Sequence, residues 1–177
     1  MERGLSDELL ACSYLRFKAE NILPLLFHEC PLTLTQYLEV FSRPETNTLG
    51  AFIVPENGGS LELAGLMWFS GTCKMGQNHT RADVGESFFR GFSQPETLVR
   101  FAQLGIQWAF EKLGISTITG ATPAPNRAGV LFARKLDFQV VGPLEGRAVW
   151  AGDLCSVYLS SMTKTRWSKI SPWGMEG

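Results

Sequence analysis

The chain has 177 residues, of which 45% are hydrophobic and 19% charged, and its formal net charge is −1 at pH 7. This balance argues against a disordered chain and against the basic footprint of a nucleic-acid-binding protein. No apolar run approaches the roughly 20 residues of a membrane span, and no secretion signal opens the chain, so we expect a cytoplasmic protein without a membrane partner. The length suits one domain over residues 1–177, with a helical part at 1–45, a core at 46–163 and a tail at 164–177.

The first part of the chain is expected to be helical. Apolar residues recur at helical spacing from residue 6 to residue 27, and Pro24 interrupts them, which predicts two short helices. A third helix is expected to follow Thr33 or Thr35 as its N-cap and to end before Pro44.

An antiparallel meander is expected next. Apolar runs of strand length at residues 48–54 and 61–69 flank residues 57–59, Asn-Gly-Gly, which suit the tight reversal of a hairpin. After a polar, glycine-rich loop at 70–79, residues 80–90 alternate as a third strand does. One face of this strand would carry Ala82, Val84, Glu86 and Phe88.

Helices and strands then alternate. In the strongest helical segment, Ser93 and Glu96 have capping-box spacing, Pro95 suits the first turn, and Gly114 suits a left-handed ending. The further elements expected are a strand at 115–119, a helix from Asn126 to Leu136, and strands at 138–144 and 153–162. Because hairpins are antiparallel and strand–helix–strand units favour parallel pairing, we expect an α/β fold with a mixed sheet. The tail shows no clear periodicity.

Two helices begin directly after strands, and their N-termini are candidate ligand sites. A helix N-terminus presents unpaired N–H groups and a partial positive charge, which together suit a phosphate. At the first, Gly91 permits close approach, Ser93 can cap or donate, and Arg90 and Arg100 could add charge-assisted contacts. An ordinary strand-to-helix turn is the alternative there. At the second, Asn126 either caps its own helix or reaches a ligand.

Residues 81–142 resemble the second half of the GCN5-related N-acetyltransferase (GNAT) fold, especially its divergent phage and prophage members. The residues in register with that family's second helix are Asn126, Gly129, Phe132, Lys135, Leu136 and Phe138. The closing segment, with its last strand and its Met, Arg and Trp residues, is also similar. Two positions depart from the family: residues 90–96 lack its regular glycine spacing, and Ala133 replaces its usual tyrosine acid.

The resemblance implies an antiparallel N-terminal meander, a parallel strand pair at a cofactor cleft, and acetyl-CoA as the cofactor. Its thioester arm would lie against Ser87, Phe88 and Phe89. Its phosphates would lie on Arg90, Gly91, Phe92, Ser93 and Gln94, and Asn126 would contact it from the other wall. The implied reaction is acetyl transfer to the amine of a small molecule or protein.

Acyl transfer to an amine needs a base and oxyanion donors. Glu86 is the candidate base, because its alternation with Phe88 would place it in an apolar-walled cleft that raises its pKa; a solvated strand carboxylate is the alternative. Asp83, on the other face, is the second candidate. The N–H groups near Phe88 and Phe89 are candidate oxyanion donors.

Two other hypotheses stay open. A GNAT-shaped protein could bind a virion or host component without chemistry, through exposed Trp150, Trp167 or Trp173. The N-terminal helices could also form a homodimer that completes the acceptor site. The four cysteines and the two histidines, His28 and His79, lack metal-ligand spacing.

Overall fold

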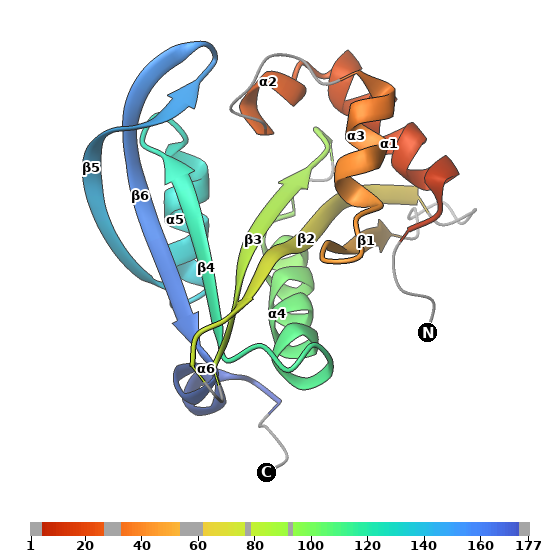
Figure 1. Cartoon of the computed structure of the whole chain (residues 1–177). Coiled ribbons are helices and arrows are strands. Elements are labelled where there is room, and N and C mark those ends of the chain that lie inside the picture. Colours follow the sequence, from red (N-terminus) through yellow and green to blue (C-terminus); the bar gives the residue numbers. More distant parts are fainter. Residues whose placement is uncertain (1–4, 27–32, 54–61, 77–78, 92–93, 174–177) are drawn as a thin grey trace.

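The computed structural model describes residues 5–26, 33–53, 62–76, 79–91 and 94–173, which include a six-stranded sheet with helices on both faces (Figure 1). The strand order is β1-β2-β3-β4-β6-β5. The strands are β1 (Asn47–Ile53), β2 (Glu62–Lys74), β3 (Thr80–Phe88), β4 (Thr117–Pro123), β5 (Gln139–Trp150) and β6 (Asp153–Thr163). The helices are α1 (Asp7–Ala19), α2 (Leu23–Leu26), α3 (Leu34–Phe41), α4 (Pro95–Lys112), α5 (Arg127–Lys135) and α6 (Lys164–Ile170).

The N-terminal helices match the sequence prediction, except that the break comes at residues 20–22 and Pro24 lies within α2. Ser6 caps α1, and Thr33, rather than Thr35, caps α3 through a complete capping box with Gln36. Between them lies the short helix α2. An aromatic cluster holds these helices against one face of the sheet, and its ring-bearing buried members are Tyr14, Phe17, Tyr37, Phe41 and Phe89. The predicted helices are therefore confirmed.

The meander is also confirmed, although β2 is longer than expected. Strand β1 pairs antiparallel with β2, and β2 pairs antiparallel with β3. Because Cys73 and Lys74 pair with the start of β3, strand structure extends into the predicted loop at 70–79. The expected reversal at residues 57–59 lies outside the described residues.

Side chains of β3 alternate as predicted. Glu86 pairs with Met67, which packs in the α4-side core, so the side chain of Glu86 lies on that face of the sheet. Gly85 lies on the opposite face, where the indole of Trp68 lies so close that a Cβ atom on Gly85 would be 2.2 Å from it.

Helix α4 begins one residue later than its predicted capping box implies. Its N-cap is Gln94, which makes no side-chain cap hydrogen bond, while Ser93 lies outside the described residues. Pro95 occupies the first turn, as expected. Gly114 follows the last turn with φ +65°, the predicted left-handed ending.

The C-terminal part contains one helix that periodicity did not predict. Strands β5 and β6 form a long antiparallel hairpin, and β6 inserts between β5 and β4. Helix α6 then begins after Thr163, whose side chain accepts a hydrogen bond from the Arg166 N–H. Trp167 of α6 is only 1% exposed, so the expectation that it is a surface residue is wrong. In the part of the chain described, no helix is both long and apolar enough to cross a bilayer.

Candidate active site

The sheet opens between its two central strands. Strands β3 and β4 run parallel for only three residue pairs, from Arg81–Thr117 to Asp83–Thr119. Beyond them β4 stays paired with β6 as far as Pro123, while β3 stays paired with β2 as far as Phe88. Each strand therefore follows its outer neighbour, and a wedge separates their C-terminal ends (Figure 1).

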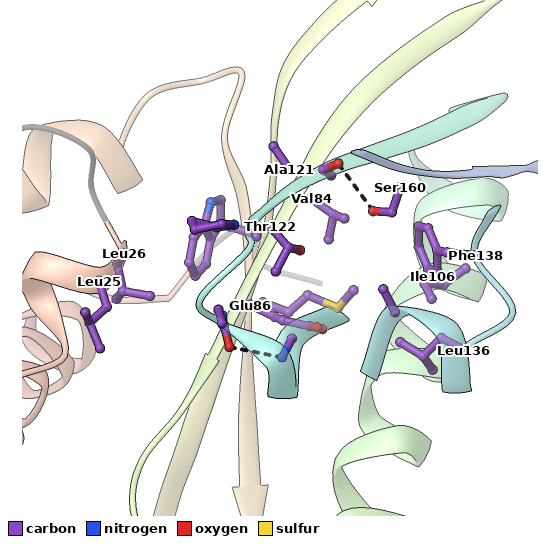
Figure 2. A pocket seen from close by; sticks show the side chains of 18 of the residues that line it. Leu25, Leu26, Val84, Glu86, Ile106, Ala121, Thr122, Leu136, Phe138 and Ser160 are labelled. Carbon is purple, nitrogen blue, oxygen red and sulfur yellow. Dashed lines mark hydrogen bonds between the residues drawn. The ribbon is translucent and has the colours of Figure 1, made fainter. Parts of the chain in front are cut away.

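A cavity of ≈ 160 Å³ occupies this wedge. Leu25 and Leu26 of α2 lie on one side of it, and Ile106, Leu136 and Phe138 lie on the other, with Val84, Glu86 and Thr122 between them (Figure 2). The remaining lining residues are Met67, Trp68, Gly85, Gly120, Ala121, Pro123, Asn126, Gly129, Ala133, Trp150 and Ser160. The cavity thus reaches from the α2 side of the sheet towards α4 and α5.

Glu86 is the ionisable residue of this cavity among the described lining residues. Part of its surface stays accessible, and the cavity is where it is exposed. Burial among neighbouring protein atoms raises the pKa of Glu86 from 4.5 to about 8, because the carboxylate loses most of its hydration. The carboxyl group consequently changes charge close to neutral pH, as a base for an amine requires.

Because of this raised pKa, Glu86 should lower the free energy of unfolding by an amount that increases with pH. The folded state holds the proton up to about pH 8 and the unfolded state releases it near pH 4.5, so the free energy of unfolding falls as pH rises between these values. Glu86→Gln lacks this loss. We expect the stability of the variant relative to wild type to increase by about 2–4 kcal/mol from pH 5 to pH 9. Urea unfolding at both pH values measures it, and a constant difference would contradict the raised pKa.

The backbone of β3 presents N–H groups to the wedge at alternate residues. The Ser116 N–H donates to the Thr80 carbonyl at 2.8 Å, so even-numbered residues of β3 direct their backbone groups towards β4. The Phe89 N–H instead donates to the Ala64 carbonyl of β2 at 2.9 Å. The amides of Glu86 and Phe88 therefore face the wedge. The Phe89 N–H does not, which removes it from the candidate oxyanion donors.

The residues predicted to bind the thioester arm and the phosphates differ in burial: some are packed in the core and others are exposed. Phe89 is 2% exposed within the N-terminal aromatic cluster, and Phe88 packs edge-on against Phe101 and Phe132. The segment between β3 and α4 also contains Arg90, Gly91 and Gln94, all exposed, while Phe92 and Ser93 lie outside the described residues. Ser87 is half-buried and does not line the cavity.

One amide of this segment already binds an anionic oxygen. The Arg90 N–H donates to Oε2 of Glu20 at 2.7 Å, and Nε of Arg16 donates to Oε1 of the same carboxylate at 3.1 Å. Gly91 follows with φ +93°, and, its chain neighbours aside, no atom of the described residues lies within 4 Å of the position that a Cβ would take. The space beside this turn is therefore open to a ligand, and the turn itself needs glycine.

The first turn of α4 carries fewer donors than a typical phosphate site. Pro95 has no N–H, and Glu96 places a negative charge in the first turn. Arg100 lies over the ring of Trp173 at 4.2 Å, so its guanidinium is occupied there. Recognition of a phosphate at this helix would depend on the preceding segment more than on the helix itself.

Asn126 lies on the wall of the cavity opposite β3, as predicted. Its Oδ1 accepts a hydrogen bond from the Gly129 N–H at 3.0 Å, which caps α5, and its side chain also lines the cavity. Gly129 permits this approach, because a Cβ there would lie 2.8 Å from Nδ2 of Asn126. Both interpretations of Asn126 are therefore compatible: Oδ1 serves the helix, and Nδ2 is not used in the cap.

Asp83 lies outside the cavity. Its carboxylate accepts a hydrogen bond from the Thr119 hydroxyl and lies 3.9 Å from the Arg81 guanidinium. These contacts are at the point where the strands are still paired, so Asp83 is a poor candidate for a base in the wedge. Within the described ranges, no three His, Cys, Asp or Glu side chains come together as metal ligands.

Sequence reasoning missed several wall residues, notably Leu25, Leu26, Trp68 and Ser160. They come from elements far apart in the chain, and their types are ordinary for a core. One signal was present: Gly85 interrupts an otherwise regular strand pattern, which often marks the close approach of another group. That group is the indole of Trp68.

The splayed parallel pair, the flanking helices and the strand order together define the GNAT fold. The comparison with solved structures shows the same fold. Spermidine N-acetyltransferase from Vibrio cholerae, in complex with CoA and spermine, has a TM-score of 0.76 and 14% identity, with 93% of this chain and 95% of that chain covered. Ribosomal-protein-S5-alanine acetyltransferase from Vibrio fischeri has a TM-score of 0.72 and 15% identity, with 93% of each chain covered.

A third structure, Mycobacterium smegmatis RimJ in complex with CoA-disulfide, has a TM-score of 0.71 and 12% identity, with 92% of this chain and 81% of that chain covered. No protein-family model matches the sequence, and the comparison with curated proteins gives no match. The likeness is therefore one of fold, at low sequence identity.

Proposed function

We propose that this protein is an acetyl-CoA-dependent N-acetyltransferase. The observation that carries the proposal is the cavity between the splayed ends of β3 and β4, which contains a carboxyl group whose pKa lies at about 8. The fold supports it, because the similar Vibrio cholerae enzyme was solved with CoA and spermine and the similar RimJ with CoA-disulfide.

The residues around the wedge fit a thioester donor. An extended thioester arm can pair with the wedge-facing amides of β3, as an added strand would. The open turn at Arg90 and Gly91 is the place for its phosphates, where the Glu20 carboxylate now binds one amide. Nδ2 of Asn126 lies on the facing wall. Within the proposed segment from Ser87 to Gln94, the Phe88 N–H would serve the thioester arm and the turn at Arg90 and Gly91 would serve the phosphates, whereas Phe89 takes no part, because its side chain is buried and its N–H is bonded to Ala64.

Glu86 and the β3 backbone would perform the acid–base work. The acceptor enters as an ammonium ion and gives one proton to the Glu86 carboxylate. Acetyl-CoA supplies the carbonyl carbon that the amine nitrogen attacks, so that a C–N bond forms and the C–S bond breaks with its electron pair going to sulfur. The Phe88 N–H would stabilise the oxyanion. Ala133 offers no acid, so the second nitrogen proton goes to the departing sulfur directly or through water.

Thermal unfolding with acetyl-CoA tests the proposal. A ligand at 100 times its dissociation constant stabilises the folded state by about 2.7 kcal/mol, which shifts the midpoint by several degrees for a chain of this size. Absence of a shift at millimolar acetyl-CoA would overturn the proposed function and leave the partner-binding hypothesis ahead.

Asn126→Ala separates a ligand contact from a helix cap. The variant loses the cap of α5, which costs about 1 kcal/mol of stability, and we expect it to lose most of the acetyl-CoA-dependent shift as well. Thr163→Ala is the matched control, because it removes the cap of α6, which does not line the cavity. Differential scanning fluorimetry with and without acetyl-CoA compares the two. If the acetyl-CoA-dependent shifts of the two variants were equal, Asn126 would serve only as the cap of α5.

A further inference from the structure

We infer that the acceptor is a small primary monoamine carried on an apolar skeleton of arylalkyl size. This inference rests on the proposed function and assigns a substrate class to the same cavity. Its basis is the part of the cavity next to α2, from which the cavity leads to Glu86 in its middle and on towards α4 and α5 (Figure 2).

The wall of the cavity next to α2 is apolar and aromatic. Leu25 and Leu26 come from α2, Trp68 comes from β2, and Trp150 comes from the end of β5. All four are half-buried, so they keep surface that a ligand could cover. Figure 1 shows both the tip of the β5–β6 hairpin and α2 at the open end of the wedge. Leucine and tryptophan surfaces at such an entrance favour a flat or branched hydrocarbon group.

The charges in the cavity suit one ammonium group and no more. Among the described lining residues, Glu86 is the single carboxylate, and none is Lys, Arg or His. An incoming ammonium can give its proton to Glu86, which leaves both partners uncharged during attack. Among the described lining residues a second ammonium, as in a polyamine, would lie against leucine and indole with no further carboxylate beside it, and burying such a charge unpaired is strongly unfavourable.

The size of the cavity points the same way. A volume of ≈ 160 Å³ encloses an acyl group and a compact amine, and the rest of a larger acceptor would lie outside the cavity. Besides Glu86, the polar uncharged side chains of Thr122, Asn126 and Ser160 line it; Oδ1 of Asn126 caps α5, its Nδ2 is assigned to the thioester donor, and the Ser160 hydroxyl donates to the Gly120 carbonyl at 3.3 Å. Little remains to recognise the peptide groups of a polypeptide acceptor.

The test compares three amines with the full chain and saturating acetyl-CoA, with CoA release followed by a thiol reagent. 2-Phenylethylamine represents the proposed class, spermidine a polyamine, and the tripeptide Ala-Ala-Ala an N-terminal peptide amine. We expect kcat/KM for 2-phenylethylamine to exceed that of both others by at least about tenfold. Equal or faster turnover of spermidine or of the tripeptide would overturn the inference.

The acetyl-CoA thermal shift distinguishes failure of the assigned substrate class from failure of the proposed function. A shift without turnover of 2-phenylethylamine overturns the substrate class and leaves cofactor binding in place. The absence of any acetyl-CoA shift overturns the proposed function itself.

Trp150→Ala tests the assigned wall at the level of one residue. We expect this variant to raise KM for 2-phenylethylamine about fivefold or more, with a smaller change in kcat. Trp173→Ala is the control, because Trp173 contacts Arg100 and does not line the cavity. An unchanged KM in Trp150→Ala would count against the assigned wall.

Discussion

Glu86→Gln is expected to lower kcat/KM for acetyl transfer by about 10²–10⁴-fold, the usual contribution of a positioned general base. The carboxyl group lines the wedge, and burial has raised its pKa to about 8, so it takes a proton from an ammonium ion far more readily than a solvated glutamate does. Glutamine keeps the size of the side chain and removes its basicity. The acetyl-CoA thermal shift should persist in this variant, which separates loss of chemistry from loss of binding.

The dependence of kcat/KM on pH tests whether the ionised form of Glu86 is the base. The ionised form of Glu86 is the active base, so wild-type kcat/KM should rise with pH until about pH 8 and then level off, until another group titrates. The Glu86→Gln profile should lack this rise. Asp83→Asn is the matched control, since Asp83 is bonded to Thr119 outside the cavity, and its profile should keep the rise. An inflection that survives in Glu86→Gln would assign the base elsewhere.

The same substitution should act in opposite directions on stability and on activity. At pH 9 the ionised carboxylate costs folding free energy, because its neighbours hydrate it poorly, and glutamine relieves that cost. Residues kept at the expense of stability are typical of active sites. Higher stability together with lost activity is therefore a combined result that a merely structural Glu86 would not give.

Local sequence signals predicted the elements well where caps and alternation were strong. Thr33, Asn126 and Gly114 are each at the helix end that the sequence indicates, since a cap depends on a few neighbouring residues. The alternation of β3 placed Glu86 and Phe88 on one face, as the register with β2 confirms. These features are local, so one segment suffices to predict them.

The wedge itself could not be predicted from local signals. It exists because β4 follows β6 while β3 follows β2, and the β4–β6 pairing joins residues as distant in the sequence as Thr117 and Thr163. The walls that narrow it, from α2 and Trp150, come from the two ends of the fold. Phe89 illustrates the same limit: its place in strand alternation was clear, but its N–H bonds to Ala64 because of the pairing of β3 with β2.

Helix α6 was missed for a related reason. Its seven residues are too few to show a reliable period, and its single fully buried side chain, Trp167, is recognisable as a core residue only when α4 packs beside it. The tryptophan indole donates to the side-chain oxygen of Gln107 on α4 and lies near Phe110, with ring centroids 6.5 Å apart. This contact connects the end of the chain to the main core.

Trp167→Ala should therefore destabilise the protein by about 3–5 kcal/mol, the usual range for removal of a buried aromatic side chain. For a chain of this length that corresponds to a fall of roughly 6–20 °C in Tm, measurable by calorimetry. Trp167→Phe keeps most of the ring and loses the indole N–H, so an intermediate loss is expected. A tryptophan that served a binding partner, as the partner-binding hypothesis supposed, would leave Tm unchanged on substitution.

The loss should leave ligand recognition intact, because α6 lies at the end of the sheet away from the open wedge (Figure 1). We expect the acetyl-CoA-dependent shift of Trp167→Ala to equal that of wild type at temperatures where the variant is folded. Asn126→Ala should show the reverse combination, a small loss of stability and a large loss of the shift. If Trp167→Ala abolished the shift while still folded, the wedge would depend on core packing at its closed end, and the site could not be treated as a local feature of β3, β4 and α5.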